Sequence, residues 1–439
     1  MKINIQTLGC PKNYNDSQMV SGSLELHNNI IVNSPEDADL IMVNTCGFIN
    51  DAKKESIDRI LEMIEYKAEG KKILVSGCLS KRYSKELMEE IPEIDGIIGV
   101  NEYNDIQDII NKIFAGEKPN IVSECSETQL LSGPRKLEDN PYSSTLKIAE
   151  GCNNRCAYCI IPGIRGPFRS KSIEDIVAEA EYLAAEGCRE LILIAQDLTY
   201  YGKDLYGKYM LPELLRKLCR IEKLQWIRLM YCYEHRITEE LIDVIATEDK
   251  ICKYLDIPLQ HGSNNILKAM RRHSTRESIE ATISRLRERI PEIHIRTTLI
   301  VGFPGETDED FESLLNFVEH NRFDRLGVFC YSQEENTLAG EMENQIDEDI
   351  KQERLDVIMR TQMEISLEKN QNKIGKTLKV IVDYKDDEGV YVGRTEFDAP
   401  DIDNTVIFKT DVNHEPGDIV KVYIEDGYDY DLMGMEVPE

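Results

Sequence analysis

Three cysteines in the segment EGCNNRCAYC constrain this 439-residue chain more than any other feature. Cys152, Cys156 and Cys159 have the spacing C-x3-C-x2-C and directly follow an apolar, strand-like run. We refer to these three residues as the core triad. Thiolates are the ligands of iron–sulfur clusters, and three of them on a four-iron cube leave one iron open to other ligands. The spacing therefore predicts a 4Fe-4S cluster with an open iron, held by a loop at the end of a strand.

Two other interpretations of the core triad remain open. A zinc knuckle requires a fourth Cys or His nearby, but the next cysteine after Cys159 is Cys188. The three residues could instead be structural cysteines of a packed core, because free cysteine is often buried. Three cysteines within eight residues of one loop disfavour that interpretation.

The N-terminal sequence and the lengths of the apolar runs predict the compartment of the protein. The N-terminus, MKINIQTLGC, has no basic segment followed by an apolar one, and no apolar run reaches the roughly 20 residues of a membrane span. We therefore expect a cytoplasmic protein with no membrane association. Twelve cysteines in that compartment favour metal binding over a disulfide framework.

The first part of the chain repeats one pattern three times, in which an apolar run is followed by a cysteine and a helix-like segment. The cysteines are Cys10, Cys46 and Cys78, which we call the N-terminal triad. Strands alternating with helices predict a small parallel α/β domain, and the carboxyl ends of parallel strands gather on one edge where ligands bind. The predicted strands are Ile3–Leu8, Leu40–Asn44, Ile73–Ser76 and Ile94–Val100, and the predicted helices are Asp16–Leu26, Ala52–Tyr66 and Lys81–Glu90. The pattern favours a second metal site, although any one of these cysteines could be core.

The middle of the chain predicts a second α/β unit with six strands. The candidate strands are Thr145–Ala149, Glu190–Ala195, Trp226–Tyr231, Tyr254–Ile257, His294–Val301 and Leu326–Tyr331, separated by helix-like segments such as Ile173–Ala185, Pro212–Leu218, Glu239–Ile245 and Arg276–Arg289. Six βα units are too few for a closed eight-fold barrel, so we expect an open, partial (βα)6 barrel. Gln196 and Asp197 end the second of these strands and are candidates for binding cofactor or substrate, although a strand-end cap is an equally good explanation.

The C-terminal part changes to short alternating strands. After a long charged helix, Asp347–Asn370, about five strands predict a small antiparallel β-barrel. They are Leu378–Asp383, Val390–Arg394, Thr405–Phe408, Ile419–Ile424 and Leu432–Val437. The predicted domains are thus residues 1–116, a linker at 117–140, a core at 141–370 and the barrel at 371–439. Residues 376–439 contain 17 acidic against 6 basic residues, a net charge of −11 within a chain of net charge −29.

The core triad, with Tyr158 before its last cysteine, resembles the radical S-adenosylmethionine superfamily. That resemblance implies that the open iron chelates S-adenosylmethionine and that one electron from the cluster cleaves the sulfonium to give a 5′-deoxyadenosyl radical. The segment TTLIVGFPGE, Thr297–Glu306, is similar to the family's fifth-strand segment near the adenosine. The resemblance implies that Tyr158, Gly302 and Gly305 contribute to cofactor binding, and Gln196 and Asp197 are further candidates because of their place at a strand end.

The arrangement of the whole chain resembles the methylthiotransferases of that superfamily. In this family the N-terminal triad binds a second 4Fe-4S cluster, which holds the sulfur to be inserted, and the C-terminal barrel is of the TRAM type. The resemblance implies that the radical removes a hydrogen from the target carbon, which then takes the sulfur, and that a second S-adenosylmethionine supplies the methyl group. The resemblance also implies an electron donor of the flavodoxin or ferredoxin type and a sulfur donor.

Two features favour one branch of the family, which modifies the β-carbon of an aspartate in ribosomal protein S-twelve of the small subunit. The wording TLGCPKN at Thr7–Asn13, followed by Asp16 and Ser17, resembles that branch, whereas the tRNA branch usually has Gln in place of Pro11. The acidic barrel would repel an RNA backbone and attract a basic ribosomal protein. Direct tRNA binding is therefore not expected, and a tRNA adenosine methylthiotransferase is the alternative.

Several residues carry weaker expectations. Arg165 and Arg169, in IIPGIRGPFRSK, are candidates for meeting an acidic substrate group, with solvated loop arginines as the alternative. His261 could touch the cofactor, although a structural histidine explains it better. The other cysteines are expected to pack in cores: Cys125, Cys188, Cys219, Cys232, Cys252 and Cys330. An iron–sulfur electron carrier and a zinc-bearing interaction protein are the alternatives outside the enzyme class, and acidity alone could serve solubility.

Overall fold

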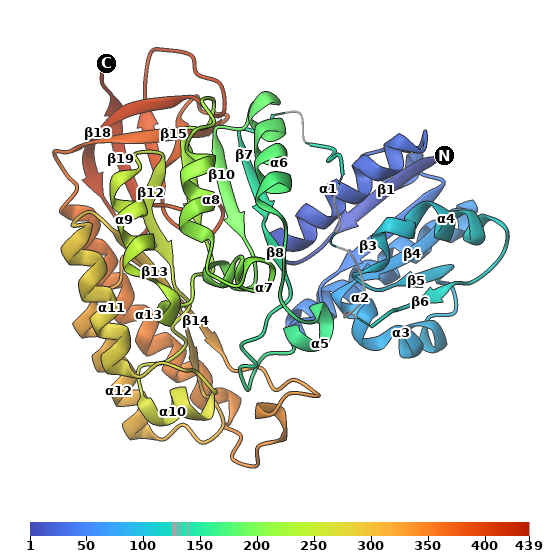
Figure 1. Ribbon diagram of the computed structural model, residues 1–439, viewed down its shortest axis with the longest axis horizontal. Helices are drawn as coiled ribbons and strands as arrows, with labels where there is room; N and C mark the ends of the chain where they lie inside the picture. The colour runs from blue at the N-terminus through green and yellow to red at the C-terminus, as the bar shows by residue number, and fades with distance from the viewer. Residues whose placement is uncertain (125–129, 131–132, 138–139, 439) are drawn as a thin grey trace.

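The computed structural model describes residues 1–124, 130, 133–137 and 140–438. It forms three units along the chain, with the N-terminal unit on one side of the central sheet and the C-terminal barrel at one end of it (Figure 1). Among the helices in these residues, none is both long enough and apolar enough to cross a membrane. Cys125 lies outside the described residues.

The N-terminal unit is a parallel sheet of six strands in the order β2-β1-β3-β4-β5-β6. The strands are β1 (Lys2–Thr7), β2 (Ile30–Ile31), β3 (Leu40–Thr45), β4 (Lys72–Gly77), β5 (Gly96–Ile98) and β6 (Asn120–Ile121). Its helices are α1 (Pro11–Leu26), α2 (Asn50–Ile64), α3 (Cys78–Glu90) and α4 (Ile106–Phe114). All residues of β3 are buried, as expected for a parallel sheet covered by helices on both faces.

The predicted α/β domain is therefore confirmed, with one difference at its end. Strand β6 pairs with β5 and lies inside the segment 117–140 that the sequence analysis assigned to a linker. A two-residue edge strand has too few positions to show the alternating pattern from which strands are predicted.

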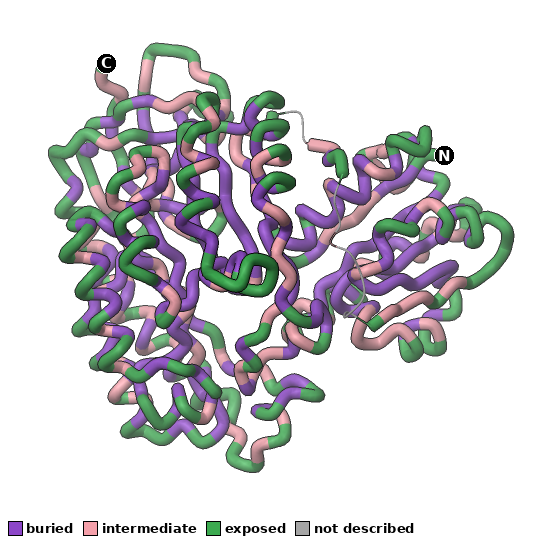
Figure 2. Tube along the Cα trace, in the orientation of Figure 1, coloured by how far each residue is buried: buried purple, intermediate pink, exposed green. Residues whose placement is uncertain are grey.

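The central unit is an open parallel sheet in the order β14-β13-β12-β11-β10-β7, which confirms the partial six-stranded barrel. The strands are β7 (Ser143–Lys147), β10 (Glu190–Ile194), β11 (Trp226–Leu229), β12 (Ile251–Asp256), β13 (His294–Val301) and β14 (Arg325–Cys330). The helices are α5 (Ile161–Arg165), α6 (Ile173–Ala185), α7 (Lys203–Tyr206), α8 (Leu211–Leu218), α9 (Glu239–Thr247), α10 (Asn264–Ala269), α11 (Arg276–Arg289) and α12 (Asp308–Asn321). Figure 2 shows the strands buried and the outer faces of the helices exposed.

The chemistry at helix starts explains why two of these helices begin where they do. Thr275 and Thr307 precede α11 and α12, and each forms a capping box in which its side-chain oxygen accepts the backbone N–H three residues on.

The cores of the central unit include Cys188, Cys232 and Cys252, while Cys219 and Cys330 pack against it partly buried. These five cysteines lie where core packing was predicted.

The C-terminal unit is a closed barrel of five strands that follows the long helix α13 (Glu348–Gln371). Its strands are β15 (Thr377–Lys385), β16 (Tyr391–Thr395), β17 (Thr405–Lys409), β18 (Ile419–Gly427) and β19 (Asp431–Glu436). Four of the five pairings are antiparallel, as predicted, and β17 pairs with β19 in parallel.

Buried ion pairs join this barrel to the amino-terminal parts of the core strands. Glu190, the first residue of β10, pairs with Arg228 of β11 and Arg394 of β16 at 2.8 and 2.9 Å. Arg325, the first residue of β14, pairs with Asp398, whose pKa falls to about 2 because Arg325 and Lys373 more than offset its burial. The barrel is thus attached at the end of the sheet opposite to the carboxyl ends of its strands.

Candidate functional site: two cysteine triads

The core triad lies on a closed loop at the carboxyl end of β7. The loop begins after β8 (Ala149–Glu150), which pairs with β9 (Arg169–Ser170) beyond the loop. Gly151 turns the chain into it with a φ of +80°, and a Cβ there would lie 2.1 Å from the carbonyl oxygen of Pro167. Only glycine fits this position, which explains the EGC wording of the motif.

The three core thiols interact with one another and belong to half-buried residues. Burial raises the pKa of Cys152 to about 11, with smaller contributions from Asp197 and Cys156. Burial also raises the pKa of Cys159, and both other thiols of the triad add to that rise. Because Cys152 and Cys159 hold their protons at neutral pH, a bound metal cluster must displace those protons.

Tyr233 lies against the core triad and was not among the predicted site residues. Its hydroxyl lies 3.0 Å from the Cys156 sulfur. The Arg272 guanidinium stacks 3.8 Å from the Tyr233 ring centroid and donates to Glu234 at 2.7 Å. Tyr233 follows the carboxyl end of β11, and active sites of such barrels lie at the carboxyl ends of the strands. Its place in YCYEHR, directly after a predicted strand, could therefore have indicated a site residue.

The N-terminal triad forms at the carboxyl edge of the first sheet. Cys10 caps α1 just after β1, Cys46 directly follows β3, and Cys78 opens α3 directly after β4. These three strands are neighbours in the order β1-β3-β4, so the fold brings together residues that are far apart in sequence. Burial, followed by the neighbouring Cys78, raises the pKa of Cys46 to about 12, and Cys10 adds to the effect.

Small residues make this close approach possible. Gly9 has a φ of +88°, and a Cβ on it would lie 2.6 Å from the Cys46 Cβ. A Cβ on Gly47 would lie 2.8 Å from the backbone of Leu79, next to Cys78. The glycines in TLGC and NTCGF therefore let the cysteine-bearing loops pack against each other.

The donor chemistry of both triads fits an iron–sulfur cluster better than a single metal ion. Within the part of the chain that the structure describes, no group of three or more His, Cys, Asp or Glu side chains surrounds one ion position. A zinc ion requires its ligands within about 2.3 Å of one centre, whereas a four-iron cluster spreads its thiolates over several irons. Three mutually interacting thiols on each sheet edge fit the latter.

Gln196 and Asp197 lie at the carboxyl end of β10, as predicted, but their contacts are within the chain. The Asp197 carboxylate accepts from Asn154 at 2.8 Å and from Thr199 at 2.7 Å, and it pairs with Arg236. Arg236 also donates to Asn154 at 2.8 Å. Asp197, at the end of the second core strand, therefore anchors the core-triad loop through Asn154. The sequence around Asp197 could not indicate this role, because Asn154 is distant in sequence.

The glycine-containing strand also has internal partners. Gly302 has a φ of +69°, and a Cβ there would lie 2.2 Å from the Lys351 side chain of α13. Its N–H donates to Glu306 at 2.9 Å. Gly305 has a φ of +83° and donates to the carbonyl of Asn344 at 2.8 Å. Both glycines are thus required by the turn itself. Buried His261 faces Glu306 at 3.3 Å, as a structural histidine does.

Tyr158 lies on the core-triad loop, where it is partly buried against a small apolar cluster that includes Phe303 and Tyr331. Burial, followed by neighbouring Cys156, raises its pKa well above that of an ordinary tyrosine. The ring therefore remains neutral and packs the loop against the glycine-containing strand.

The expectation that Arg165 meets an acidic substrate group is wrong. Its side chain is 2% exposed, and it pairs with Asp16 at 2.7 Å and with Glu150 at 3.2 Å. Half-buried Arg169 donates to the Arg165 carbonyl at 3.3 Å. Nothing in the loop sequence IIPGIRGPFRSK marks Arg165 as buried, because its partners come from other segments.

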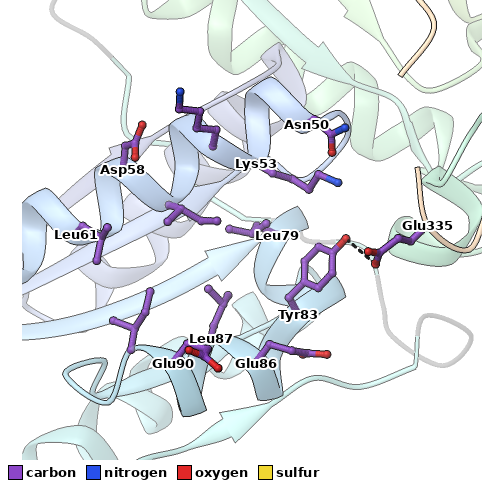
Figure 3. A pocket seen from close by; sticks show the side chains of 13 residues that line it. Asn50, Lys53, Asp58, Leu61, Leu79, Tyr83, Glu86, Leu87, Glu90 and Glu335 are labelled. Carbon is purple, nitrogen blue, oxygen red and sulfur yellow. Dashed lines mark hydrogen bonds between the residues drawn. The ribbon is translucent and has the colours of Figure 1, made fainter. Parts of the chain in front are cut away.

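The N-terminal unit carries a surface groove between α2 and α3, with a volume of about 640 Å³. Its floor is apolar and includes Leu61, Leu79 and Leu87, and neither triad lines it (Figure 3). Tyr83 at its end donates to Glu335 of the core at 3.3 Å. Next to it, Glu334 of the core pairs with Lys53 and Arg82 at 2.9 and 2.8 Å. The residues at this end of the groove therefore connect the N-terminal unit to the core.

Three family models match the chain in the order of the three units. Residues 2–99 match the uncharacterized protein family UPF0004, residues 146–318 match the radical SAM superfamily, and residues 374–437 match the TRAM domain.

Solved structures with a similar fold include the radical S-adenosylmethionine methyltransferase TsrM from Kitasatospora setae, with cobalamin and a [4Fe-4S] cluster bound. It matches with a TM-score of 0.58 at 16% identity, over 77% of each chain. The cobalamin-dependent S-adenosylmethionine radical enzyme OxsB matches with a TM-score of 0.53 at 14% identity, over 82% of this chain and 56% of that one. These likenesses support the fold.

Relatives of much higher identity bear the name ribosomal protein uS12 methylthiotransferase RimO. One from Desulforamulus reducens is 51% identical over 98% of both chains, and one from Clostridioides difficile is 48% identical over 99% of this chain and 98% of the relative. With about half of its residues identical over almost its whole length, the chain belongs to the uS12 methylthiotransferase family of radical S-adenosylmethionine enzymes.

Proposed function

We propose that this enzyme transfers a methylthio group to the β-carbon of an aspartate in ribosomal protein uS12. The observation that carries the proposal is the pair of cysteine triads, one at the carboxyl edge of each parallel sheet, in a chain about half identical to uS12 methylthiotransferases. A methylthio transfer to carbon needs a radical source and a sulfur carrier, and each triad fits one of these tasks.

The core triad would hold a 4Fe-4S cluster that binds S-adenosylmethionine at its open iron. When bound, the pair would supply the one-electron chemistry that substitution at an unactivated carbon requires. The chain's own residues support this site: the Asn154 backbone N–H contacts the Cys152 sulfur and the Tyr233 hydroxyl contacts the Cys156 sulfur. The residues proposed to contact the cofactor are Tyr158, Gln196, Asp197, Gly302 and Gly305.

The N-terminal triad would hold the second 4Fe-4S cluster, whose open iron carries the sulfur. Its cysteines are Cys10, half-buried at the start of α1, and the buried Cys46 and Cys78. Cys10 is more exposed to solvent than Cys46 and Cys78. A substrate loop would therefore reach the sulfur from the side of the triad on which Cys10 lies.

The charge of the C-terminal barrel supports a basic protein as substrate. A net charge of −11 over residues 376–439 attracts and steers a basic ribosomal protein, whereas the phosphates of tRNA would be repelled. The barrel is attached to the amino-terminal parts of the core strands, so it would hold a part of the substrate away from the residue that reacts. The reaction would take place in the cytoplasm, with an electron donor of the flavodoxin or ferredoxin type and a sulfur donor.

The test uses the full chain reconstituted anaerobically with iron and sulfide. Reductant, S-adenosylmethionine and a peptide copied from the aspartate-bearing loop of uS12 are added, and the peptide is analysed by mass spectrometry. A mass gain of one methylthio group in place of hydrogen on the aspartate supports the proposal. Formation of 5′-deoxyadenosine with an unmodified peptide, together with a modified tRNA adenosine in a parallel reaction, would refute the choice of substrate.

A further inference from the structure

A buried network of four charged side chains lies between the two triads. Asp16 comes from α1, Lys147 from β7, Glu150 from β8 and Arg165 from α5. Their side chains are at most 7% exposed. Lys147 pairs with Asp16 and lies 2.6 Å from Glu150. Arg165 also pairs with both, so each cation contacts both carboxylates. The network contains two positive and two negative groups and joins the N-terminal unit to the core.

Arg165 is the member of this network that reaches the N-terminal triad. One terminal nitrogen donates to Asp16 at 2.7 Å and to Glu150 at 3.2 Å. The other donates to the Asn13 side-chain oxygen at 2.6 Å and lies 3.5 Å from the Cys78 sulfur. A planar guanidinium can contact all four groups at once, which the single ammonium of a lysine cannot do.

The same short helix connects this arginine to the core triad. Helix α5 begins two residues after Cys159, and its residue Ile164 packs with Ile160 against Cys78 and Val100. On the other side of the network, Gln196 donates to Glu150 at 2.6 Å. Helix α5 therefore links the core-triad loop to Cys78 through its terminal arginine and through Ile164.

We propose that Arg165 is a positioning residue that fixes Cys78, and with it the sulfur-carrying N-terminal triad, relative to the loop that holds the core triad. The proposal rests on the proposed function, because it assigns Arg165 to the step in which both sites act on one substrate carbon. A displacement of about 1 Å at such a site can cost about 100-fold in rate. The guanidinium also places a positive charge beside a proposed cluster ligand.

The test compares Arg165→Met and Arg165→Lys with Arg394→Met in the full chain loaded with iron and sulfide. Arg394 is a matched control, because it is also a buried arginine in a network of ion pairs at a domain junction, with Glu190 and Asp383 as its partners. That junction joins the core to the C-terminal barrel and touches neither triad. Both methionine variants thus remove a buried cation, but only one does so beside Cys78.

The first measurement is the reduction potential of the N-terminal cluster, in a background in which the three core-triad cysteines are alanine. Reduction adds negative charge to a cluster, and a nearby N–H donor and positive charge favour it. Arg165→Met is therefore expected to move the potential to more negative values, Arg165→Lys to move it less, and Arg394→Met to leave it unchanged.

The second measurement is the amount of methylthiolated peptide formed per 5′-deoxyadenosine in the enzyme with both clusters. We expect a fall of about 10- to 100-fold in Arg165→Met, because a loosened sulfur site misses the substrate carbon while radical formation continues. The product ratio of Arg165→Lys is expected to lie between those of wild type and Arg165→Met. If the methionine variant is insoluble, the comparison of Arg165→Lys with wild type tests the proposal.

Unchanged potential and product ratio in a soluble Arg165 variant would overturn the proposal, as would an equal change in Arg394→Met, which would indicate general loosening. If the wild-type enzyme itself fails to modify the peptide, the proposed function fails, and the potential still shows whether Arg165 contacts the N-terminal cluster site.

Discussion

Glu190 offers a quantitative test of how the acidic barrel is held on the core. Its side chain is fully buried between Arg228 and Arg394, and Ser143 donates to it at 2.8 Å. Burial alone would raise the pKa of this carboxyl, but Arg394 and Arg228 more than offset that effect, and the pKa falls from 4.5 to about 2. The substitution Glu190→Gln keeps the shape and removes the charge.

The fall of the Glu190 pKa from 4.5 to about 2 converts to about 3 kcal/mol of folding free energy, because one pKa unit is worth 1.36 kcal/mol. Removing one member of a buried ion network typically costs about 3–5 kcal/mol, which agrees. Because the folded-state pKa of Glu190 is depressed, its contribution is fully present above pH 4.5 and is lost as the pH falls toward 2. Glu190→Gln is therefore expected to be less stable than wild type by about 3 kcal/mol at pH 7, and the difference should shrink below pH 4.5.

The assay is urea unfolding of the full chain at pH 7 and at a series of lower pH values. Glu240→Gln is the control, since Glu240 forms an exposed pair with Arg216 and its loss should cost at most about 1 kcal/mol. A difference between wild type and Glu190→Gln that does not depend on pH would refute the reasoning, because it would mean that the ionisation of Glu190 does not set the stability of this junction.

Three further predictions concern the triads. Replacing any core-triad cysteine by alanine should abolish formation of 5′-deoxyadenosine, measured by chromatography, and undiminished cleavage would contradict the assignment. Replacing any N-terminal-triad cysteine should leave some cleavage and stop sulfur insertion into the uS12 peptide; peptide that still gains the methylthio group would show that this triad is not the sulfur site. Tyr233→Phe removes a hydroxyl 3.0 Å from the Cys156 sulfur and should move the core cluster to a more negative potential in a redox titration followed by electron paramagnetic resonance. An unchanged potential would mean that the hydroxyl does not donate to the bound thiolate.

Local patterns sufficed to predict the architecture and the places of the cysteines. Strands such as β3 and β10 are mostly apolar, fully buried and flanked by helices, which is typical of parallel strands. Once the strands are parallel, geometry alone brings Cys10, Cys46 and Cys78 to one edge, and the observed order β1-β3-β4 agrees. The parallel pairing of β17 with β19 was not predicted, because alternation within a strand carries no information about its partner.

The side chains around the triads could not be predicted because their partners are distant in sequence. Arg165 bonds to Asp16 across 149 positions, and Tyr233 meets Cys156 across 77. Both residues lie in polar, loop-like sequence segments, in which side chains are usually exposed to solvent. Asp197 lies at the predicted strand end, but its partners Asn154 and Arg236 make it an anchor of the cluster loop.

The motif that pointed to the uS12 branch has a physical meaning in this fold. In TLGCPKN and the residues after it, the polar side chains turn inward: Asn13 donates to the carbonyls of Leu8 and Thr45, Ser17 accepts from Thr7, and Asp16 pairs with Arg165. Lys12 also reaches the core, where its ammonium lies 3.3 Å from the ring centroid of Tyr231. The motif therefore shapes the loop around Cys10 and docks it on the core.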